Sequence, residues 1–113
     1  MTKPDPRVRS QLEAERDRLT TELAEEIEGP GQMTYGSQAA AAAEVFEQQR
    51  VLALRDQAQH HLTLVQAALD RMDAGTYGTC LRCGNPIGTE RLEALPWAAY
   101  CIECQRIVDR EHH

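Results

Sequence analysis

The chain has 113 residues, with 18 acidic and 12 basic side chains, so its net charge is −6. This balance disfavours unaided binding to DNA, because duplex binders usually present a basic face. Only 4% of the residues are aromatic and 15 are alanine, which leaves little bulk for a globular core. We therefore expect stability to come from a bound metal ion or from long paired helices.

The longest wholly apolar run is the six residues 97–102, far short of the roughly 20 residues that a membrane helix needs. No apolar stretch follows the charged residues of the N-terminal segment, so we expect no secretory signal. Both observations favour a cytoplasmic protein without a membrane segment.

The first predicted element is an amphipathic helix over about residues 6–28. Its apolar residues fall within one stripe about 100° wide, and charged residues fill the remainder. The run Gly29-Pro30-Gly31 then ends it. The stripe consists of Val8, Leu12, Leu19, Leu23 and Ile27.

The second predicted element is a long helix from residue 37 or 38 to Ala74, free of Gly and Pro. Its apolar residues recur at steps of three and four, which is typical of a coiled-coil seam. The seam comprises Val51, Leu54, Ala58, Leu62, Val65, Leu69 and Met72.

The short break between these two helices predicts an antiparallel hairpin, residues 1–74, with its tip near 29–37. In this arrangement the first helix covers the first two-thirds of the second. The remaining stretch, 62–72, would then be covered by the C-terminal segment. The whole chain is expected to be all-α, a helical coiled-coil hairpin followed by a small C-terminal unit.

That C-terminal unit, residues 75–113, contains all four cysteines and most of the turn-forming residues. The cysteines form two Cys-x2-Cys pairs separated by seventeen residues, the spacing of a tetrahedral four-cysteine zinc site. Gly84 after the first pair suits the tight turn of such a site. We expect a short final helix after the second pair. The predicted metal ligands are Cys80, Cys83, Cys101 and Cys104.

Two disulfides or a redox Cys-x-x-Cys could use the same cysteines. Disulfides are disfavoured in the cytosol, and a thioredoxin-like motif needs a βαβ pattern that the sequence lacks. Four thiolates would close the coordination sphere, so one Zn²⁺ would be structural and not catalytic. No nucleophile–base arrangement or phosphate-binding glycine loop is visible, and we expect no enzyme activity.

The sequence also allows predictions for two ring-bearing side chains, Trp97 and His61. Trp97, in the loop before the second cysteine pair, is expected to pack this unit against the long helix. His61 lies beside the seam and is expected to flank it, not to bind metal.

The residues around the cysteines closely resemble the zinc finger of the DksA/TraR family of bacterial transcription regulators. The shared features are Tyr-Gly before the first cysteine, Cys-Gly-x-Pro-Ile after the first pair, Arg-Leu-x-Ala-x-Pro in the loop and a final Cys-Gln. A stretch of the long helix, 45–54, is also similar to the family's second coiled-coil helix. The matching finger residues run from Tyr77 to Pro96 and from Tyr100 to Gln105.

The resemblance implies a function that composition alone could not indicate. Family members bind RNA polymerase and not DNA, and they insert the helical hairpin into the enzyme's secondary channel so that its tip approaches the catalytic Mg²⁺. Several act together with the alarmone ppGpp. Whether this chain binds ppGpp is left open by its sequence.

The chain departs from the family at the hairpin tip. When it is aligned on Cys80 without gaps, the family's Asp-x-x-Asp-x-Ala motif falls on Ser37, Ala40 and Ala42, so both carboxylates are replaced. A tip without carboxylates has little charge with which to perturb a magnesium ion. These three positions, with Tyr35 in the glycine-rich turn, are our candidates for partner contact.

Three functions remain open. The hairpin could enter the secondary channel and act by occlusion, or the chain could be a protein–protein adaptor for a different partner. Alternatively, the finger could bind nucleic acid weakly through its arginines, which are Arg82, Arg91, Arg106 and Arg110.

Overall fold

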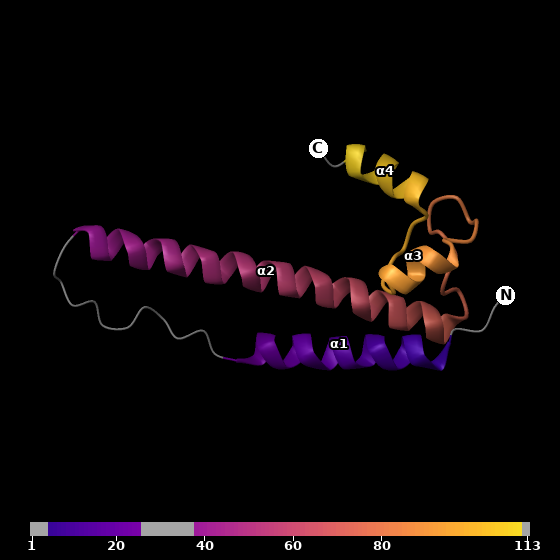
Figure 1. Cartoon of the computed structure of the whole chain (residues 1–113), viewed down its shortest axis with the longest axis horizontal. Helices are drawn as coiled ribbons and strands as arrows, with labels where there is room; N and C mark the ends of the chain where they lie inside the picture. The colour runs from indigo at the N-terminus through magenta and orange to yellow at the C-terminus, as the bar shows by residue number, and fades with distance from the viewer. Residues whose placement is uncertain (1–4, 26–37, 112–113) are drawn as a thin grey trace.

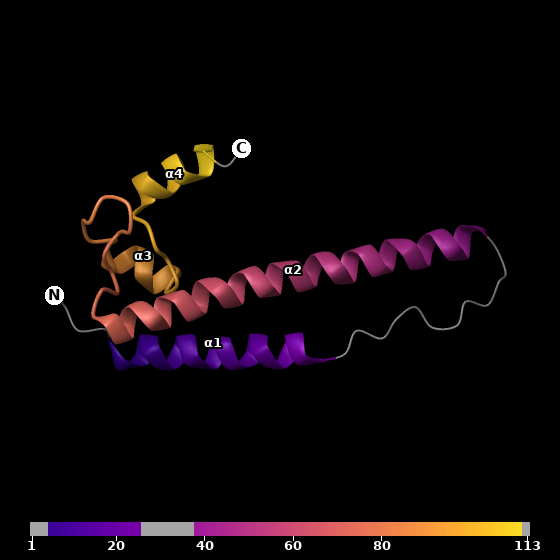
Figure 2. The same cartoon turned by 180° about the vertical axis from the view of Figure 1, so that it is seen from behind.

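A computed structural model describes residues 5–25 and 38–111, which form a two-helix rod with a small finger at one end (Figures 1 and 2). The molecule measures 63 × 31 × 20 Å along its principal axes. The described residues form four helices and no strand, which confirms the all-α prediction. They are α1 (Pro6–Ala24), α2 (Gln38–Ala74), α3 (Thr89–Ala94) and α4 (Ile102–Glu111).

Helix α1 begins with a standard N-terminal cap. The Asp5 carboxylate accepts a hydrogen bond from the Arg7 backbone N–H, and Pro6 occupies the first turn, where no intrahelical N–H is needed. The helix ends at Ala24, four residues before the predicted end. The predicted hairpin tip, 29–37, lies outside the described residues.

Helix α2 has the predicted bounds and runs antiparallel to α1. At one end the Arg9 guanidinium contacts the Asp73 carboxylate at 2.8 Å. At the other, Arg55 donates hydrogen bonds to the carbonyl oxygens of Leu23 and Glu25. Between these contacts lies the main core, in which the predicted seam residues pack against α1. The core consists of Leu12, Leu19, Val65, Ala68, Leu69 and Met72.

The predicted register of the hairpin is wrong. Helix α1 covers the C-terminal half of α2, from about Arg55 to Asp73, and not its first two-thirds. The buried part of the seam therefore begins near Ala58, whereas Leu54 is half exposed. The stretch 62–72 is covered by α1 and the finger together, because Tyr77 and Trp97 pack against the same core as Leu12.

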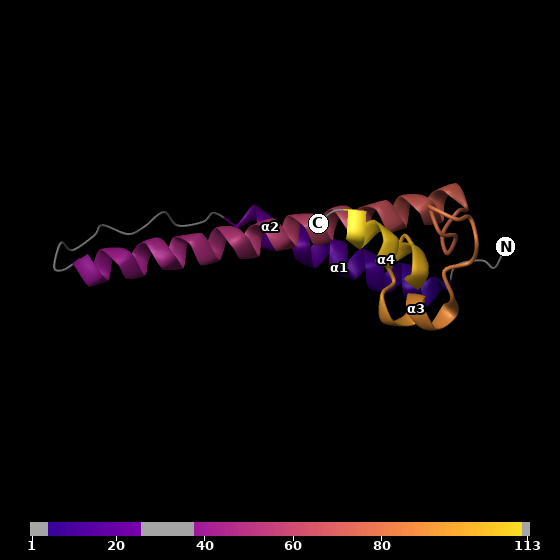
Figure 3. The same cartoon turned by 90° about the horizontal axis from the view of Figure 1, so that it is seen from above.

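The finger follows α2 after a reversal at Gly75, whose φ of +76° is readily adopted only by glycine. Its own small core is separate from that of the helices and contains Cys80, Ile87, Ala98 and Cys104. The short helix α3 was not predicted. Viewed from above, α3 and α4 lie near the end of the rod at which α2 terminates (Figure 3).

Two side chains hold the backbone of residues 96–98, Tyr77 from within the finger and Arg71 from α2. The Tyr77 hydroxyl donates a hydrogen bond to the Pro96 carbonyl oxygen at 2.9 Å. The Arg71 guanidinium lies 3.4 Å from the carbonyl oxygens of both Trp97 and Ala98. Burial lowers the pKa of Arg71, because the surrounding protein solvates the charge less well than water does.

Trp97 itself packs on the rod, as predicted. Its ring meets the His61 imidazole edge to face, with the ring centroids 4.4 Å apart. The Nε2 atom of His61 lies 3.2 Å from a Glu15 carboxylate oxygen on α1. This contact group therefore joins α1, α2 and the finger.

None of the described helices combines the length and apolar character required to span a bilayer.

Candidate metal centre and helical rod

The four predicted cysteines converge on one point of the finger. Their Sγ atoms all lie within 4.8 Å of one another, and those of Cys83 and Cys101 are 3.9 Å apart. Two tetrahedral ligands at a Zn–S distance of about 2.3 Å are about 3.8 Å apart. The arrangement therefore fits a single zinc ion. The four cysteines are Cys80, Cys83, Cys101 and Cys104.

The first cysteine pair is held by a tight backbone turn. The Gly84 N–H donates to the Cys80 carbonyl oxygen at 3.0 Å, and the Cys80 N–H donates to the Asn85 carbonyl oxygen at 2.8 Å. Gly84 has a φ of +76°, which a side chain would strain. The isolated β-bridge between Thr79 and Pro86 closes the loop behind this turn. The turn directs both sulfur atoms toward the same centre.

The second pair is placed by the start of α4. The Gln105 N–H donates to the Cys101 carbonyl oxygen at 2.8 Å, so Cys101 and Cys104 lie one helical turn apart on the same face. Leu81 links the two halves, because its N–H donates to the Ala99 carbonyl oxygen at 2.9 Å. The Arg82 guanidinium lies 3.9 Å from the Cys104 sulfur, where its positive charge favours a thiolate.

The pKa values of Cys80 and Cys104 are shifted in opposite directions. Burial opposes ionisation of Cys80, but the backbone N–H groups of Cys83, Cys101 and Arg82 lower its pKa to about 6. For Cys104, the hydrogen bond to the Cys101 sulfur and then burial raise the pKa to about 12. Additional thiolates would place like charges side by side. A divalent cation removes this conflict, since it binds the deprotonated form of each cysteine.

Two of the four predicted partner-contact residues lie at the opposite end of the rod. Ala40 and Ala42 are in the first turns of α2, and both side chains are exposed. Ser37 and Tyr35 lie outside the described residues. The start of α2, with Ala40 and Ala42, and the metal centre therefore lie at different ends of the elongated molecule (Figure 1).

Two of the four finger arginines make contacts within the chain. Arg82 faces the Cys104 sulfur, and Arg91 donates from Nε to the Tyr100 carbonyl oxygen at 2.9 Å. Arg106 and Arg110 are exposed on α4. The arginines thus do not form one free basic surface, which weakens the interpretation as a nucleic-acid-binding finger.

Two structural residues could not have been identified from the sequence pattern. Arg55 reaches across to the end of α1, and Arg71 holds the finger loop. Both bind backbone carbonyl groups 26 to 32 residues away, and such contacts leave no local sequence signal.

Comparisons with known proteins agree with this geometry. Residues 75–110 match the family model described as the prokaryotic dksA/traR C4-type zinc finger. Together with the converging cysteines, this match establishes a structural zinc site in the finger.

Similarity to whole proteins extends over most of the chain. The chain is 33% identical over 103 residues to an uncharacterized protein of Aquifex aeolicus. This match covers 86% of the chain and 63% of that protein. The chain is 30% identical over 101 residues to the RNA polymerase-binding transcription factor DksA of Escherichia coli, covering 89% of this chain and 64% of DksA. The chain thus spans less than two thirds of the length of these curated relatives.

A solved structure, that of transcription factor DksA2 from Pseudomonas aeruginosa, matches with a TM-score of 0.60 and 31% sequence identity. The match covers 95% of this chain and 79% of that one. The likeness therefore includes both the helical rod and the finger.

Proposed function

The chain belongs to the DksA/TraR family, and we propose that it is a transcription regulator that binds RNA polymerase in the cytoplasm, without catalysing a reaction. The observation that carries the proposal is the combination of a C4-type finger with a two-helix rod of the same fold as DksA2. The DksA proteins of Salmonella typhimurium and Escherichia coli, to which the chain is similar, are named as RNA polymerase-binding transcription factors.

We assign the zinc ligands to Cys80, Cys83, Cys101 and Cys104, whose sulfur atoms meet the distance requirement of one tetrahedral ion. The zinc would act structurally, because four protein ligands leave no position for substrate. Residues 1–74 and 75–113 would act as a rod and a finger. Their separate core clusters support this division.

The elongated shape suits insertion into a narrow channel. Helix α2 has 37 residues, which corresponds to about 55 Å at 1.5 Å per residue. Of the parts of the chain that the structure describes, α1 and the finger lie beside the C-terminal half of this helix and not beside its N-terminal half (Figure 1). We propose that the N-terminal half enters the secondary channel of the polymerase while the finger stays outside.

The tip would act by occupying space. Ser37, Ala40 and Ala42 carry no charge, so they offer no carboxylate to draw on the catalytic Mg²⁺ or its bound water. Occlusion of the channel, or competition with other factors that enter it, needs only the length of the helix.

A competition experiment tests the proposal. The zinc-loaded chain is mixed with purified core RNA polymerase and titrated with a second protein known to enter the secondary channel. Binding that the competitor displaces is the expected result. Binding that resists the competitor would indicate an adaptor that uses another surface, and absence of binding to polymerase would overturn the proposal. A duplex DNA arm of the same assay is expected to give no salt-sensitive binding.

A further inference from the structure

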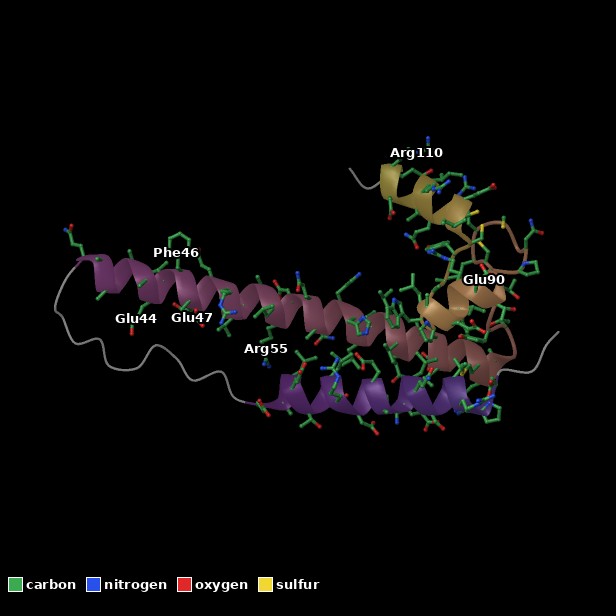
Figure 4. The ribbon with its side chains drawn as sticks, in the orientation of Figure 1. Glu44, Phe46, Glu47, Arg55, Glu90 and Arg110 are labelled. Atoms are coloured by element: carbon green, nitrogen blue, oxygen red, sulfur yellow. The ribbon has the colours of Figure 1, made fainter. Side chains whose placement is uncertain are left out.

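The N-terminal half of α2 exposes large apolar side chains on the face that points away from α1. Phe46 is 74% exposed, Val45 52% and Leu52 49%. In Figure 4 the Phe46 ring points to the side of the rod on which the finger lies, whereas Glu44, Glu47 and Arg55 point to the α1 side. Exposed large apolar residues that cluster mark interaction surfaces.

These residues belong to a continuous surface, which we call the outer strip. At 100° per residue its members occupy one side of the helix over about 20 Å, and none of them is charged. The charged residues of the same segment, Glu44, Glu47 and Arg50, lie outside this arc. The outer strip consists of Ala39, Ala42, Val45, Phe46, Gln49, Leu52 and Ala53.

The charges around the outer strip indicate what covers it. Asp56 lies one helical turn beyond Leu52 on the same side, and it forms no ion pair with any residue in 5–25 or 38–111. The chain as a whole carries a net charge of −6, which opposes close approach of a second copy. A partner surface that complements the strip would be apolar and would carry a Lys or Arg at the level of Asp56.

We propose that the outer strip is the surface through which the rod binds its protein partner, with Phe46 as the central buried residue. The inference rests on the proposed function, which identifies that partner as RNA polymerase. A large aromatic side chain contributes strongly to binding when a partner removes it from water. The alanines beside Phe46 allow the partner's backbone to approach the helix closely.

Two neighbouring leucines provide a matched test. Leu52 on the outer strip and Leu54 on the opposite, α1-facing side are 49% and 50% exposed. Serine at either position has the same small cost in helix propensity. The Phe46→Ser/Leu52→Ser variant is expected to bind core RNA polymerase at least tenfold more weakly than the natural sequence. The Leu54→Ser variant is expected to bind within twofold of it, with circular dichroism confirming equal helix content in all three proteins.

The outcomes separate this inference from the proposed function. If the natural chain does not bind polymerase, both fail. If it binds and is displaced by a secondary-channel competitor, but the double variant binds equally well, only the outer strip is wrong. If sedimentation shows that the natural chain dimerises and that Phe46→Ser restores the monomer, the strip is occupied by a second copy and the inference is also overturned.

Discussion

Arg55 on α2 donates a hydrogen bond to the carbonyl oxygen of Leu23 in the last turn of α1. A second, weaker bond of 3.4 Å reaches the Glu25 carbonyl oxygen. Helix α1 has no basic residue in its own last turn, so a residue of the partner helix supplies the cation that favours a helix C-terminus. Arg55 thereby fixes the level on α2 at which α1 ends.

Replacing Arg55 with Met keeps the aliphatic stem and removes these bonds. The free energy of unfolding is expected to fall by about 1 kcal/mol, since two carbonyl groups lose a charged donor. Urea unfolding followed by circular dichroism measures the change. The control is Arg50→Met, because the exposed ion pair of Arg50 with Glu47 is screened by water and contributes little to stability. If Arg55→Met and Arg50→Met lowered the free energy of unfolding equally, Arg55 would not be stabilising the C-terminus of α1.

Removal of zinc is expected to unfold the finger and leave the helix pair. Metal binding supplies about 10–16 kcal/mol of apparent folding free energy in small zinc fingers, whereas the core containing Leu12 and Val65 contains no cysteine. In Cys83→Ser, zinc content should fall while most helical circular dichroism remains. Leu81→Ser, at an exposed neighbouring position, should retain one zinc per chain. A Cys83→Ser protein with bound zinc and an ordered finger would refute this assignment.

His61 is expected to hold the finger against the rod through Trp97. Loss of the edge-to-face contact of 4.4 Å in His61→Ala should cost about 1 kcal/mol. Because Trp97 is the only tryptophan in the sequence, its fluorescence should shift toward the emission of an exposed indole. His60→Ala, at the exposed neighbouring position, should leave the spectrum unchanged. Identical spectra for all three proteins would show that His61 does not position the indole.

The helix pair is expected to lose stability in acid through Glu15. Arg18, and to a smaller extent His61, lower the pKa of Glu15 below its ordinary 4.5. A carboxyl group whose pKa is lowered by folding stabilises the protein above its unfolded pKa, and that stability is lost as the pH falls through the lowered folded value. Glu15→Gln should therefore reduce the dependence of the melting temperature on pH below about 4.5.

Arg18→Gln provides the partner experiment for Glu15. Since Arg18 is the largest cause of the lowered pKa, its removal should reproduce most of the effect of Glu15→Gln. The double variant should show nearly the same pH dependence of the melting temperature as Glu15→Gln alone. A pH profile that neither substitution alters would contradict this explanation.

The sequence allowed the chemistry of the finger to be predicted more completely than the packing of the rod. Two Cys-x2-Cys pairs impose their own geometry, so the cluster from Cys80 to Cys104 could be predicted from spacing. The bounds of α2 followed from an uninterrupted helical pattern. The register of the hairpin could not be predicted from this pattern. The apolar residues of α2 recur regularly, so the apolar stripe of α1 can pack against them at more than one position along α2. The level is set by Arg9 with Asp73 and by Arg55 with Leu23, and these contacts are remote in sequence.

Crosslinking from the rod tests the central claim most directly. A photoreactive amino acid in place of the exposed Ala42, near the start of α2, is placed in the zinc-loaded chain and irradiated with core RNA polymerase. The proposed function predicts crosslinks to polymerase residues that line the secondary channel, and their loss when a secondary-channel competitor is present. Crosslinks confined to the outer surface of the polymerase, or none despite stable binding, would show that the rod does not enter the channel.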